Sequence, residues 1–535
     1  MKALRPLALA ALALAARAQD PGRDFVRAGA PGGLPAPLAA AVDQLDAARM
    51  GATLAALADP ARQGRGLGTP GLAASVAQVR RALAATGFRP LGPSWEQAVP
   101  LREVAPAPGR VDLRIGGRTF AFRGGRDAVL PAVAPGTLAG DLVFAGFGIQ
   151  EPSLGHDDYR GLSVRGKVVV FRAGTPAGEA WRTGERKARW DSDRPADRYD
   201  ARLALLEKLG ARAAIALEPG LDQRLAAGQE PPLPYFLAAP GVPGSGEPPL
   251  ARLTPNPDLL RALEAGGPGR ATLAVRGRLR TLREVNLLGR LEGSDPALRR
   301  EAVLLGAHLD HLGMPAGRVH PGADDNSSGV AALLELARVL GQAPVRPRRT
   351  LLVAFWTGEE EGKFGSGHYV RHPRWPLEAT RAYLNLDMIG HPWTAADLQD
   401  LARDTGLGPG HPLLQDLDLA RFAEPGLSDR DPALGPILRQ AGLGTGMNLH
   451  LDWTDGRHGG SDYRDFARRG LPFVRFFGSY FPAYHTPGDT ADQVDPAQVQ
   501  RMARLVLATA WLLADAPEGW KGTLTPAAPP RRTSP

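Results

Sequence analysis

The chain has 535 residues, of which 43% are hydrophobic and 22% are charged, which is enough for two or three packed domains. Its formal net charge is +8, but the basic residues are scattered along the whole length and form no basic stripe, so we expect no nucleic-acid partner. The sequence contains no cysteine, which excludes disulfide bonds, thiolate metal ligands and cysteine-peptidase chemistry.

Residues 1–18 have the pattern of an export signal. A short basic segment, Met1–Arg5, precedes an apolar run over Leu7–Ala16, and small residues at Ala16-Arg17-Ala18 mark the cleavage position. The apolar run is too short for a lasting membrane anchor, and no later segment approaches the length of a span. We therefore expect a protein that is exported to the periplasm or secreted, with no stable membrane span in the mature chain.

The next two segments differ in pattern. Residues 19–127 begin with two predicted helices, 38–57 and 72–87, and continue with strand-like alternation. Residues 128–270 predict a small β-rich domain inserted into the main one. Its expected elements are a helix at 202–209 and buried strands at 142–148, 166–171 and 213–217.

Residues 271–516 alternate strands and helices, which predicts an α/β fold with a mostly parallel mixed sheet flanked by helices. Residues 19–127 would form the N-terminal part of this same domain. The final residues, 517–535, are rich in proline and poor in apolar side chains, so we expect a disordered tail. Four apolar runs in the α/β segment have the character of buried strands: 302–307, 351–356, 382–386 and 472–477.

Candidate metal ligands follow each of these four strands in turn. They are His308 after the first, Glu359 and Glu360 after the second, Asp387 after the third, and His485 one loop beyond the fourth. Because open α/β sheets place their sites outside the carboxyl ends of the strands, we expect these side chains to converge. Asp325 precedes an apolar helix at 330–340, where free N–H groups and the helix dipole favour a carboxylate.

Each of these signals is weak alone, and the ordered set carries the prediction. The ligands are imidazole and carboxylate with no sulfur, which suits zinc and leaves Co²⁺ or Mn²⁺ open. The sequence therefore predicts a metal site.

Five motifs resemble the zinc aminopeptidases of clan MH, which include bacterial leucyl aminopeptidases, glutamate carboxypeptidase and glutaminyl cyclase. The motifs are G-A-H-L-D at 306–310, G-A-D-D-N-S-S-G at 322–329, E-E-E-G-K-F-G-S at 359–366, N-L-D-M-I-G at 385–390 and Y-H-T-P-G-D-T at 484–490. The resemblance runs from about residue 286 to residue 514. Residues 128–270 resemble the protease-associated domain, with G-F-G, D-Y, G-K-V-V-V and K-L-G-A-R in the expected order.

The resemblance implies a role for each matched residue. Asp325 would bridge two Zn²⁺ ions, His308 and Asp387 would complete one site, and Glu360 and His485 the other. Glu359 would be the general base. Asp310 would accept the imidazole N–H of His308, and the peptide bond from Asp325 to Asn326 would be cis. The implied reaction removes N-terminal amino acids from peptides that have a free N-terminus.

Some features depart from this pattern or carry no clear role. Lys363 stands where the family more often has leucine, and it would alter the pocket rim or face water. Residues 392–449 form a long insertion that would shape the specificity pocket or run over the surface. His311 and His458 are expected at the rim or surface, where they could contact substrate.

Three alternative functions stay open at this point. A carboxypeptidase of the same fold would need basic residues for the substrate carboxylate, and the sequence has many arginines. A glutaminyl cyclase would need one zinc and would usually lack part of the ligand set, which is complete here. A non-catalytic, peptidase-like binding protein should have lost ligands or the base, and none is missing.

Overall fold

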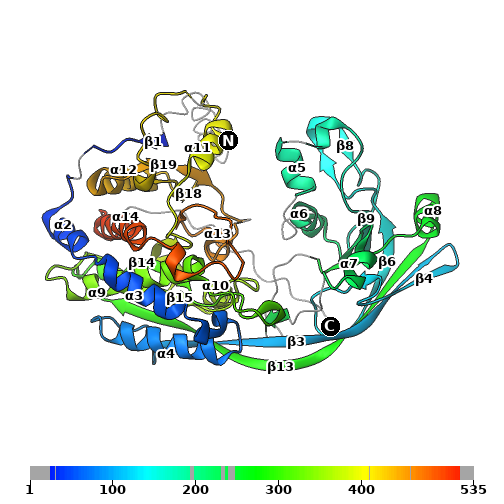
Figure 1. Ribbon diagram of the computed structural model, residues 1–535, viewed down its shortest axis with the longest axis horizontal. Coiled ribbons are helices and arrows are strands. Elements are labelled where there is room, and N and C mark those ends of the chain that lie inside the picture. The colour runs from blue at the N-terminus through cyan, green and yellow to red at the C-terminus, as the bar shows by residue number, and fades with distance from the viewer. Residues whose placement is uncertain are drawn as a thin grey trace. The chain divides into compact units, whose positions relative to one another are not determined.

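The computed structural model describes residues 24–29, 32–182, 184–192, 198–229, 235–238, 248–408, 410–457 and 459–517. The predicted export signal, His458 and the predicted tail beyond residue 517 lie outside these described residues. The chain forms two compact units. Unit 1 comprises Met1–Val99 and Glu284–Pro535, and unit 2 comprises Pro100–Arg283. Two long strands, β3 (Glu96–Ile115) and β13 (Gly269–Leu291), have residues in both units (Figure 1).

The sheet of unit 1 is mixed and mostly parallel in its centre, as the sequence predicts. Its strand order is β20-β18-β21-β16-β14-β15-β13. The central strands β14, β15, β16 and β21 pair in parallel, whereas β13 and β18 pair antiparallel at the flanks. The bounds are β14 Ala302–His308, β15 Thr350–Trp356, β16 Thr380–Leu386, β18 Gly426–Ser428, β20 Asp452–Thr454 and β21 Phe473–Phe476.

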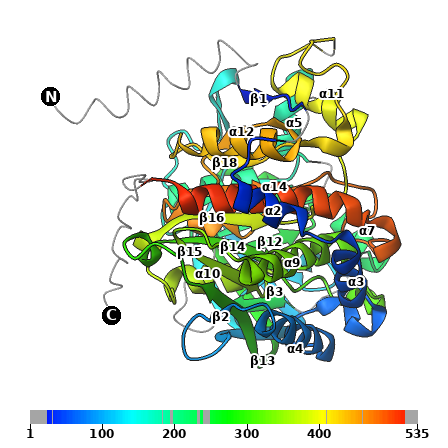
Figure 2. The same cartoon turned by 90° about the vertical axis from the view of Figure 1, so that its left-hand side faces the viewer.

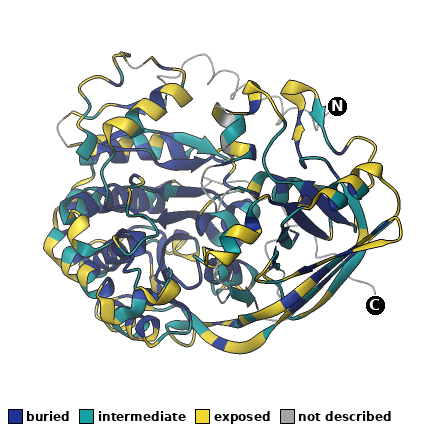
Figure 3. Ribbon diagram, turned by 45° about the vertical axis from the view of Figure 1, so that its right-hand side comes forward, coloured by how far each residue is buried: buried dark blue, intermediate teal, exposed yellow. Residues whose placement is uncertain are grey.

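Helices cover both faces of this sheet. On one face α9 (Gly329–Gln342) and α14 (Pro496–Asp515) contact each other and β14 (Figure 2). On the other face α10 (Phe364–Arg371) and α13 (Tyr463–Arg468) pack on a buried cluster that includes Trp356, Tyr383 and Phe466. The central strands β14 and β15 are therefore buried along their whole length (Figure 3).

The N-terminal helices of unit 1 differ in one respect from the prediction. The single helix expected at 38–57 is two helices, α2 (Ala36–Asp43) and α3 (Ala47–Leu57). The break occurs because the side chain of Asp46 accepts hydrogen bonds from the N–H groups of Ala48 and Arg49 and so begins a new helix. The second predicted helix is α4 (Pro70–Ala84), and the short strand β2 (Arg89–Pro90) follows it.

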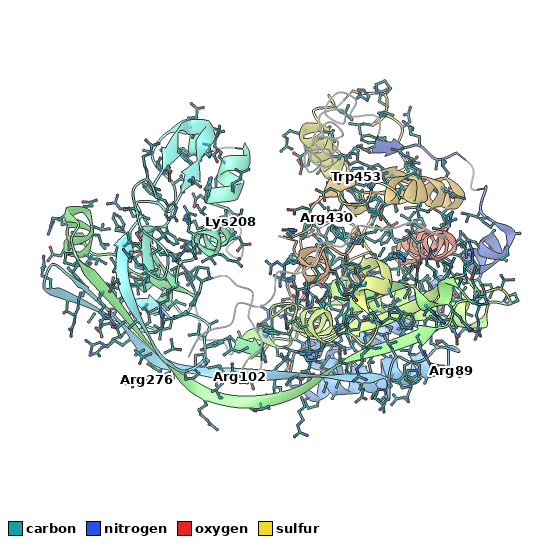
Figure 4. All side chains as sticks on the ribbon, turned by 180° about the vertical axis from the view of Figure 1, so that it is seen from behind. Arg89, Arg102, Lys208, Arg276, Arg430 and Trp453 are labelled. Carbon is teal, nitrogen blue, oxygen red and sulfur yellow. The ribbon has the colours of Figure 1, made fainter. Side chains whose placement is uncertain are left out.

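The stretch 392–449 is more than a surface excursion, because its strand β18 pairs with β21 and extends the main sheet. It also supplies two strands of a small sheet with β1 (Phe25–Val26). The indole N–H of Trp453 on β20, labelled in Figure 4, donates to Asp24 just before β1. The other elements of the stretch are α11 Ala395–Asp404, β17 Phe422–Ala423, α12 Leu434–Thr445 and β19 Asn448–His450.

Unit 2 is built on the strand order β13-β6-β9-β10-β12-β5. It is wider than the insert predicted at 128–270, because most of β3 and its hairpin partner β4 belong to it. Arg102 on β3 and Arg276 on β13 mark the two long strands within this unit (Figure 4). Its other strands are β4 Arg118–Arg123, β5 Ala128–Val129, β6 Gly136–Phe144, β7 Gln150–Glu151, β8 His156–Asp157, β9 Val168–Arg172, β10 Ala213–Leu217, β11 Tyr235–Ala238 and β12 Leu250–Leu253.

The helices of unit 2 are α5 Gly184–Trp190, α6 Asp200–Leu209, α7 Leu221–Ala226 and α8 Pro257–Ala265. The strand predicted at 213–217 is found with those bounds, and the helix predicted at 202–209 begins two residues earlier. Across the described residues of both units, no helix is long and apolar enough to cross a membrane.

Candidate metal centre

Four adjacent parallel strands bring the predicted ligands to one edge of the unit 1 sheet. His308 is the last residue of β14, and Asp387 directly follows β16. Glu359 and Glu360 lie just beyond β15, and His485 lies in the loop after β21. Since these strands are neighbours with the same direction, their carboxyl ends meet at this edge, as the topological argument requires.

Asp325 lies at the centre of the cluster, and each of its two carboxylate oxygens faces a different histidine. Its Oδ1 is 3.3 Å from His308 Nε2, which is itself 3.2 Å from Asp387 Oδ1. Its Oδ2 is 3.1 Å from His485 Nε2, which is 3.2 Å from Glu360 Oε2. The structure thus brings together all five side chains that the sequence proposes as ligands, in two sets that share Asp325.

These separations fit metal ligation better than a set of ion pairs. Two ligand atoms bound to one tetrahedral zinc at its usual bond lengths are about 3.3 Å apart, and all four distances lie close to that value. Among the described residues no lysine or arginine forms an ion pair with Asp325 or Glu360. Buried carboxylates without a protein counter-charge are the environment that a divalent cation stabilises.

The pKa values of the two central carboxyl groups agree with this description. Burial acts to raise the pKa of Asp325, but hydrogen bonds with His308 and His485 outweigh it and hold the pKa well below its ordinary value. For Glu360, burial and the charge of Asp325 act upward, whereas His311 and His485 lower the pKa to about 2. Both groups are therefore ionised at neutral pH, as metal ligands must be.

The loop that carries Asp325 is held by side chains that the sequence did not single out. Asp489, fully buried, accepts hydrogen bonds from the backbone N–H groups of Asp324 and Asp325 at 2.9 and 3.1 Å. The Asn326 amide donates to the carbonyl of Leu386, one residue before Asp387. The Asp325–Asn326 peptide bond is cis, as the resemblance implies. The one sequence signal for Asp489 is its position in the Y-H-T-P-G-D-T motif.

Asp310 contacts His308 as the resemblance implies, and it does so through its backbone. His308 Nδ1 lies 3.2 Å from the backbone carbonyl oxygen of Asp310. The Asp310 carboxylate instead accepts from the backbone N–H groups of Glu359 at 3.1 Å and Glu360 at 3.4 Å. The reason is geometric: Asp310 is only two residues from His308, so its carbonyl reaches the ring while its side chain is free to cross to the neighbouring strand end.

Arg65 contacts the backbone around the site, and no sequence pattern points to it. Its guanidinium is fully buried and donates only to backbone carbonyls, those of Leu57, Leu309, Pro321, Gly322 and Asp325. Burial lowers the pKa of Arg65 to about 10, with nearby carboxylates acting in the opposite direction, so the group stays charged at neutral pH. It therefore fixes the loops on either side of the metal cluster.

Glu359 is buried and contacts a cation. The Nζ of Lys363 lies 3.0 Å from Glu359 Oε1, and its side chain is largely buried, which rules out the water-facing position considered for it. Burial raises the pKa of Glu359, and the charges of Lys363 and His308 oppose that rise. A carboxylate with a raised pKa is better suited to accept a proton near neutral pH than an exposed one.

His311 is not at the surface, contrary to the expectation. It is 2% exposed, and its Nδ1 lies 2.5 Å from Glu360 Oε1. The surface assignment was wrong because His311 lies on an irregular segment that passes beneath the cluster, where strand and helix periodicity give no information about direction. His311 is thus a further imidazole within the candidate centre.

A cavity in unit 2 is a weaker candidate for the chemistry. Its volume is about 290 Å³, and its lining includes Pro108, Leu130, Leu225, Tyr235 and Val275. The Tyr235 hydroxyl already donates to the Val133 carbonyl at 2.6 Å. No histidine, aspartate or glutamate is among the described residues that line this cavity.

An α/β sheet that gathers paired imidazoles and carboxylates at its carboxyl edge defines a metallopeptidase type of domain. Residues 286–510 match the model of peptidase family M28. The resemblance drawn from the five motifs is therefore confirmed at the level of the family.

Individual relatives agree with this assignment. A probable zinc metalloprotease of Leptosphaeria maculans is 28% identical over 214 residues, which cover 37% of this chain and 49% of the relative. Aminopeptidase YwaD of Bacillus subtilis is 29% identical over 218 residues, covering 39% of this chain and 41% of the relative. The chain thus spans about half or less of the length of these curated relatives.

One solved structure shares the fold across nearly the whole chain. The aminopeptidase from Aneurinibacillus sp. strain AM-1 is 20% identical, with a TM-score of 0.50, and the match covers 92% of this chain and 98% of that protein. At this identity the likeness concerns the fold alone.

Proposed function

We propose that this chain is an exported aminopeptidase that binds two zinc ions and removes N-terminal residues from peptides. The observation that carries the proposal is the position of the Asp325 carboxylate between two histidines. One oxygen lies 3.3 Å from His308 Nε2 and the other lies 3.1 Å from His485 Nε2. One carboxylate between two imidazole–carboxylate pairs is the arrangement that two bridged metal ions need. Co²⁺ or Mn²⁺ would suit the same oxygen and nitrogen donors.

In this proposal His308, Asp325 and Asp387 hold one ion, and Asp325, Glu360 and His485 hold the other. Bound there, the ions would supply a water molecule of lowered pKa and a polarised substrate carbonyl. Glu359 is the general base: its carboxylate takes the proton of the attacking water and returns it to the leaving amine. Asp310 positions this base, because its side chain accepts the N–H groups of both Glu359 and Glu360.

The proposed metal centre suits the amino end of a peptide better than the carboxyl end. Each ion held there would keep an open coordination position, and a free α-amine can occupy it. Lys363 is a nearby cation, but its ammonium already contacts Glu359 at 3.0 Å. A carboxypeptidase would need a free basic group there, and a one-zinc cyclase would not need the full set of five ligands. Aminopeptidase activity is therefore the preferred function.

The predicted organisation of the chain belongs to the same proposal. Residues 1–18 are an export signal that leaves a periplasmic or secreted enzyme. Residues 128–270 are a protease-associated domain, for which the strand and helix order of unit 2 is the support. Residues 19–127 and 271–516 form the catalytic domain around it.

The test measures metal content and end-group preference together. Purified protein should contain close to two zinc ions per chain by elemental analysis. It should hydrolyse leucyl anilide and leave the N-acetylated anilide intact, since acetylation removes the ammonium group. An N-blocked dipeptide with a free carboxylate should also be inert. Hydrolysis of the blocked dipeptide in preference to the leucyl anilide would establish a carboxypeptidase instead, and metal-free, inactive protein would favour a binding function.

A further inference from the structure

Contacts on several sides hold His311 within the candidate centre. Its backbone N–H donates to the carbonyl of Arg65 at 3.2 Å. Its ring packs against Gly322, where an added Cβ would come within 2.5 Å of the His311 Cδ2 atom. Its ring centroid is 5.9 Å from that of His485. The imidazole is therefore held in one place by the backbone around it.

Distances separate His311 from the five proposed ligands. The nitrogen–oxygen separations of His308 and His485 to their carboxylates lie between 3.1 and 3.3 Å, which suits two atoms on one metal. His311 Nδ1 is only 2.5 Å from Glu360 Oε1, and it is 3.8 Å from Asp325 Oδ2. The first value is a short charge-assisted hydrogen bond, too close for two ligands of one ion.

The two oxygens of Glu360 therefore have different partners. Oε2 faces His485 at 3.2 Å, on the side of the proposed ion, whereas Oε1 faces His311. Without a partner for Oε1 this carboxylate could rotate about its last bond and exchange its oxygens. A fixed donor on Oε1 removes that freedom.

We propose that His311 is a positioning residue that donates from Nδ1 to Glu360 Oε1 and thereby holds Oε2 toward the second metal ion. This inference rests on the proposed two-metal function. The tautomer follows from burial: among the described residues Nε2 has no hydrogen-bond partner. A buried acceptor without a partner costs less than a buried N–H without one, so the proton resides on Nδ1. Neighbours that orient a metal-binding side chain typically change metal affinity about 10- to 100-fold when removed.

The test uses variants that distinguish the two ring nitrogens. In His311→Asn the side-chain amide can place a donor near the position of Nδ1, whereas in His311→Gln it reaches toward that of Nε2. His311→Ala removes both. His450→Ala is the matched control, because His450 Nδ1 contacts Glu424 Oε1 at 2.7 Å in the same unit without a metal cluster.

Zinc affinity is measured by competition with a chelator, alongside thermal unfolding of the metal-free proteins. We expect His311→Ala and His311→Gln to bind the second zinc about 10- to 100-fold more weakly than wild type, and the first about normally. His311→Asn should keep most of the affinity, and His450→Ala all of it.

Three results would overturn the inference. A zinc affinity equal to wild type in His311→Ala would show that the contact between His311 and Glu360 has no effect on metal binding. Equal, severe loss in the Asn and Ala variants, with a changed Co²⁺ absorption spectrum in both, would make His311 a direct ligand. A wild-type protein that binds only one zinc, or none, would remove the proposed function itself and this inference with it. If the Ala variant does not fold, the comparison of Asn with Gln decides alone.

Discussion

The buried acidic groups of the two units have different partners. In unit 2, Glu218 is 4% exposed and contacts three arginines, with Arg198 at 3.2 Å and Arg252 at 3.4 Å, and it also accepts from the Tyr199 hydroxyl at 3.1 Å. In unit 1, Asp325 is equally buried, but its carboxylate contacts only histidine side chains, and no arginine or lysine, among the described residues. Glu218 is thus paired with permanently charged groups, whereas the Asp325 carboxylate faces imidazoles that can also bind a metal ion.

This difference distinguishes a carboxylate with a structural role, Glu218, from one with a proposed functional role, Asp325. A buried carboxylate is costly unless something compensates it, and arginine does so permanently in unit 2. In unit 1 the nearest guanidinium, that of Arg65, is bonded to carbonyls and not to the carboxylates. The proposed function assigns the compensation of this carboxylate to bound metal ions as well as to the histidines that face it.

The largest expected effect is on catalysis. Glu359→Gln should keep both zinc ions and lower kcat/KM on leucyl anilide by about 100- to 10,000-fold, because a proton acceptor is lost and no ligand is. Elemental analysis and steady-state kinetics on the same preparation measure both quantities.

Glu218→Gln is the matched control for this variant, since it removes the negative charge of a buried glutamate in unit 2. It should lower stability because three arginines lose a charged carboxylate near them, and it should leave kcat unchanged. A similar loss of kcat in both variants would contradict the assignment of Glu359 as base and the distinction between the units.

Removal of the metal should come next in size and should affect one unit only. A ligand present at about 1,000 times its dissociation constant stabilises the native state by about 4 kcal/mol. Chelation should therefore lower the melting temperature and increase hydrogen exchange in residues 322–329 and 357–362. Strands β9 and β10 of unit 2 should keep their protection. Equal loss of protection in both units would show that the metals stabilise more than the candidate centre.

Two of the buried arginines, one in each unit, allow a sharper comparison. Arg202 of unit 2 resembles Arg65, because both are 0% exposed and both donate to backbone carbonyls, for Arg202 those of Phe147 and Trp190 among others. Replacing either by methionine should cost at least about 3 kcal/mol, since several buried carbonyls lose their donor. Only Arg65→Met should also weaken zinc binding in a chelator competition.

Arg65→Lys keeps the charge and serves as the milder variant should Arg65→Met fail to fold. Zinc affinity unchanged in a folded Arg65 variant would mean that this arginine holds the fold without influencing the metal loops.

The strands and the five proposed ligands could be predicted from the sequence because both depend on local pattern. Apolar runs such as 351–356 are continuous, and His308, Asp387 and the paired glutamates stand where those runs end. A single topological rule then brings them together. The strand at 213–217 is predictable for the same reason. The division of the helix at 38–57 into two is not predictable from apolar spacing, because it depends on one capping aspartate.

The supporting residues could not be predicted, because their partners are distant in the chain. Arg65 reaches the carbonyl of Asp325 across 260 positions, and Asp489 reaches the N–H of Asp324 across 165. His311 lies three residues from His308 but belongs to no regular element. Long-range contacts of this kind follow from packing, and no spacing within one element indicates them.

The smallest expected effect concerns a histidine in unit 1 whose surroundings are the opposite of the metal edge. His368 on α10 lies 4.7 Å from the ring of His372, and it has arginines and no acid as its charged neighbours. Burial, followed by the positive charges of His372, Arg371 and Arg374, lowers the pKa of His368 to about 4. The unfolded chain, with an ordinary pKa near 6.5, binds a proton in this range that the folded protein does not.

The stability contributed by neutral His368 is thus present above about pH 6.5 and is lost as the pH falls toward about 4. Because the ring is half exposed, solvent screening keeps the effect below about 1 kcal/mol. His368→Gln, measured by urea unfolding in chelator at about pH 7 and about pH 5, should lose less stability on acidification than wild type. Equal losses of stability in the variant and the wild type would show that solvent screens the positive charges around His368 completely. The different environments of His368 and the metal edge would then have no effect on stability.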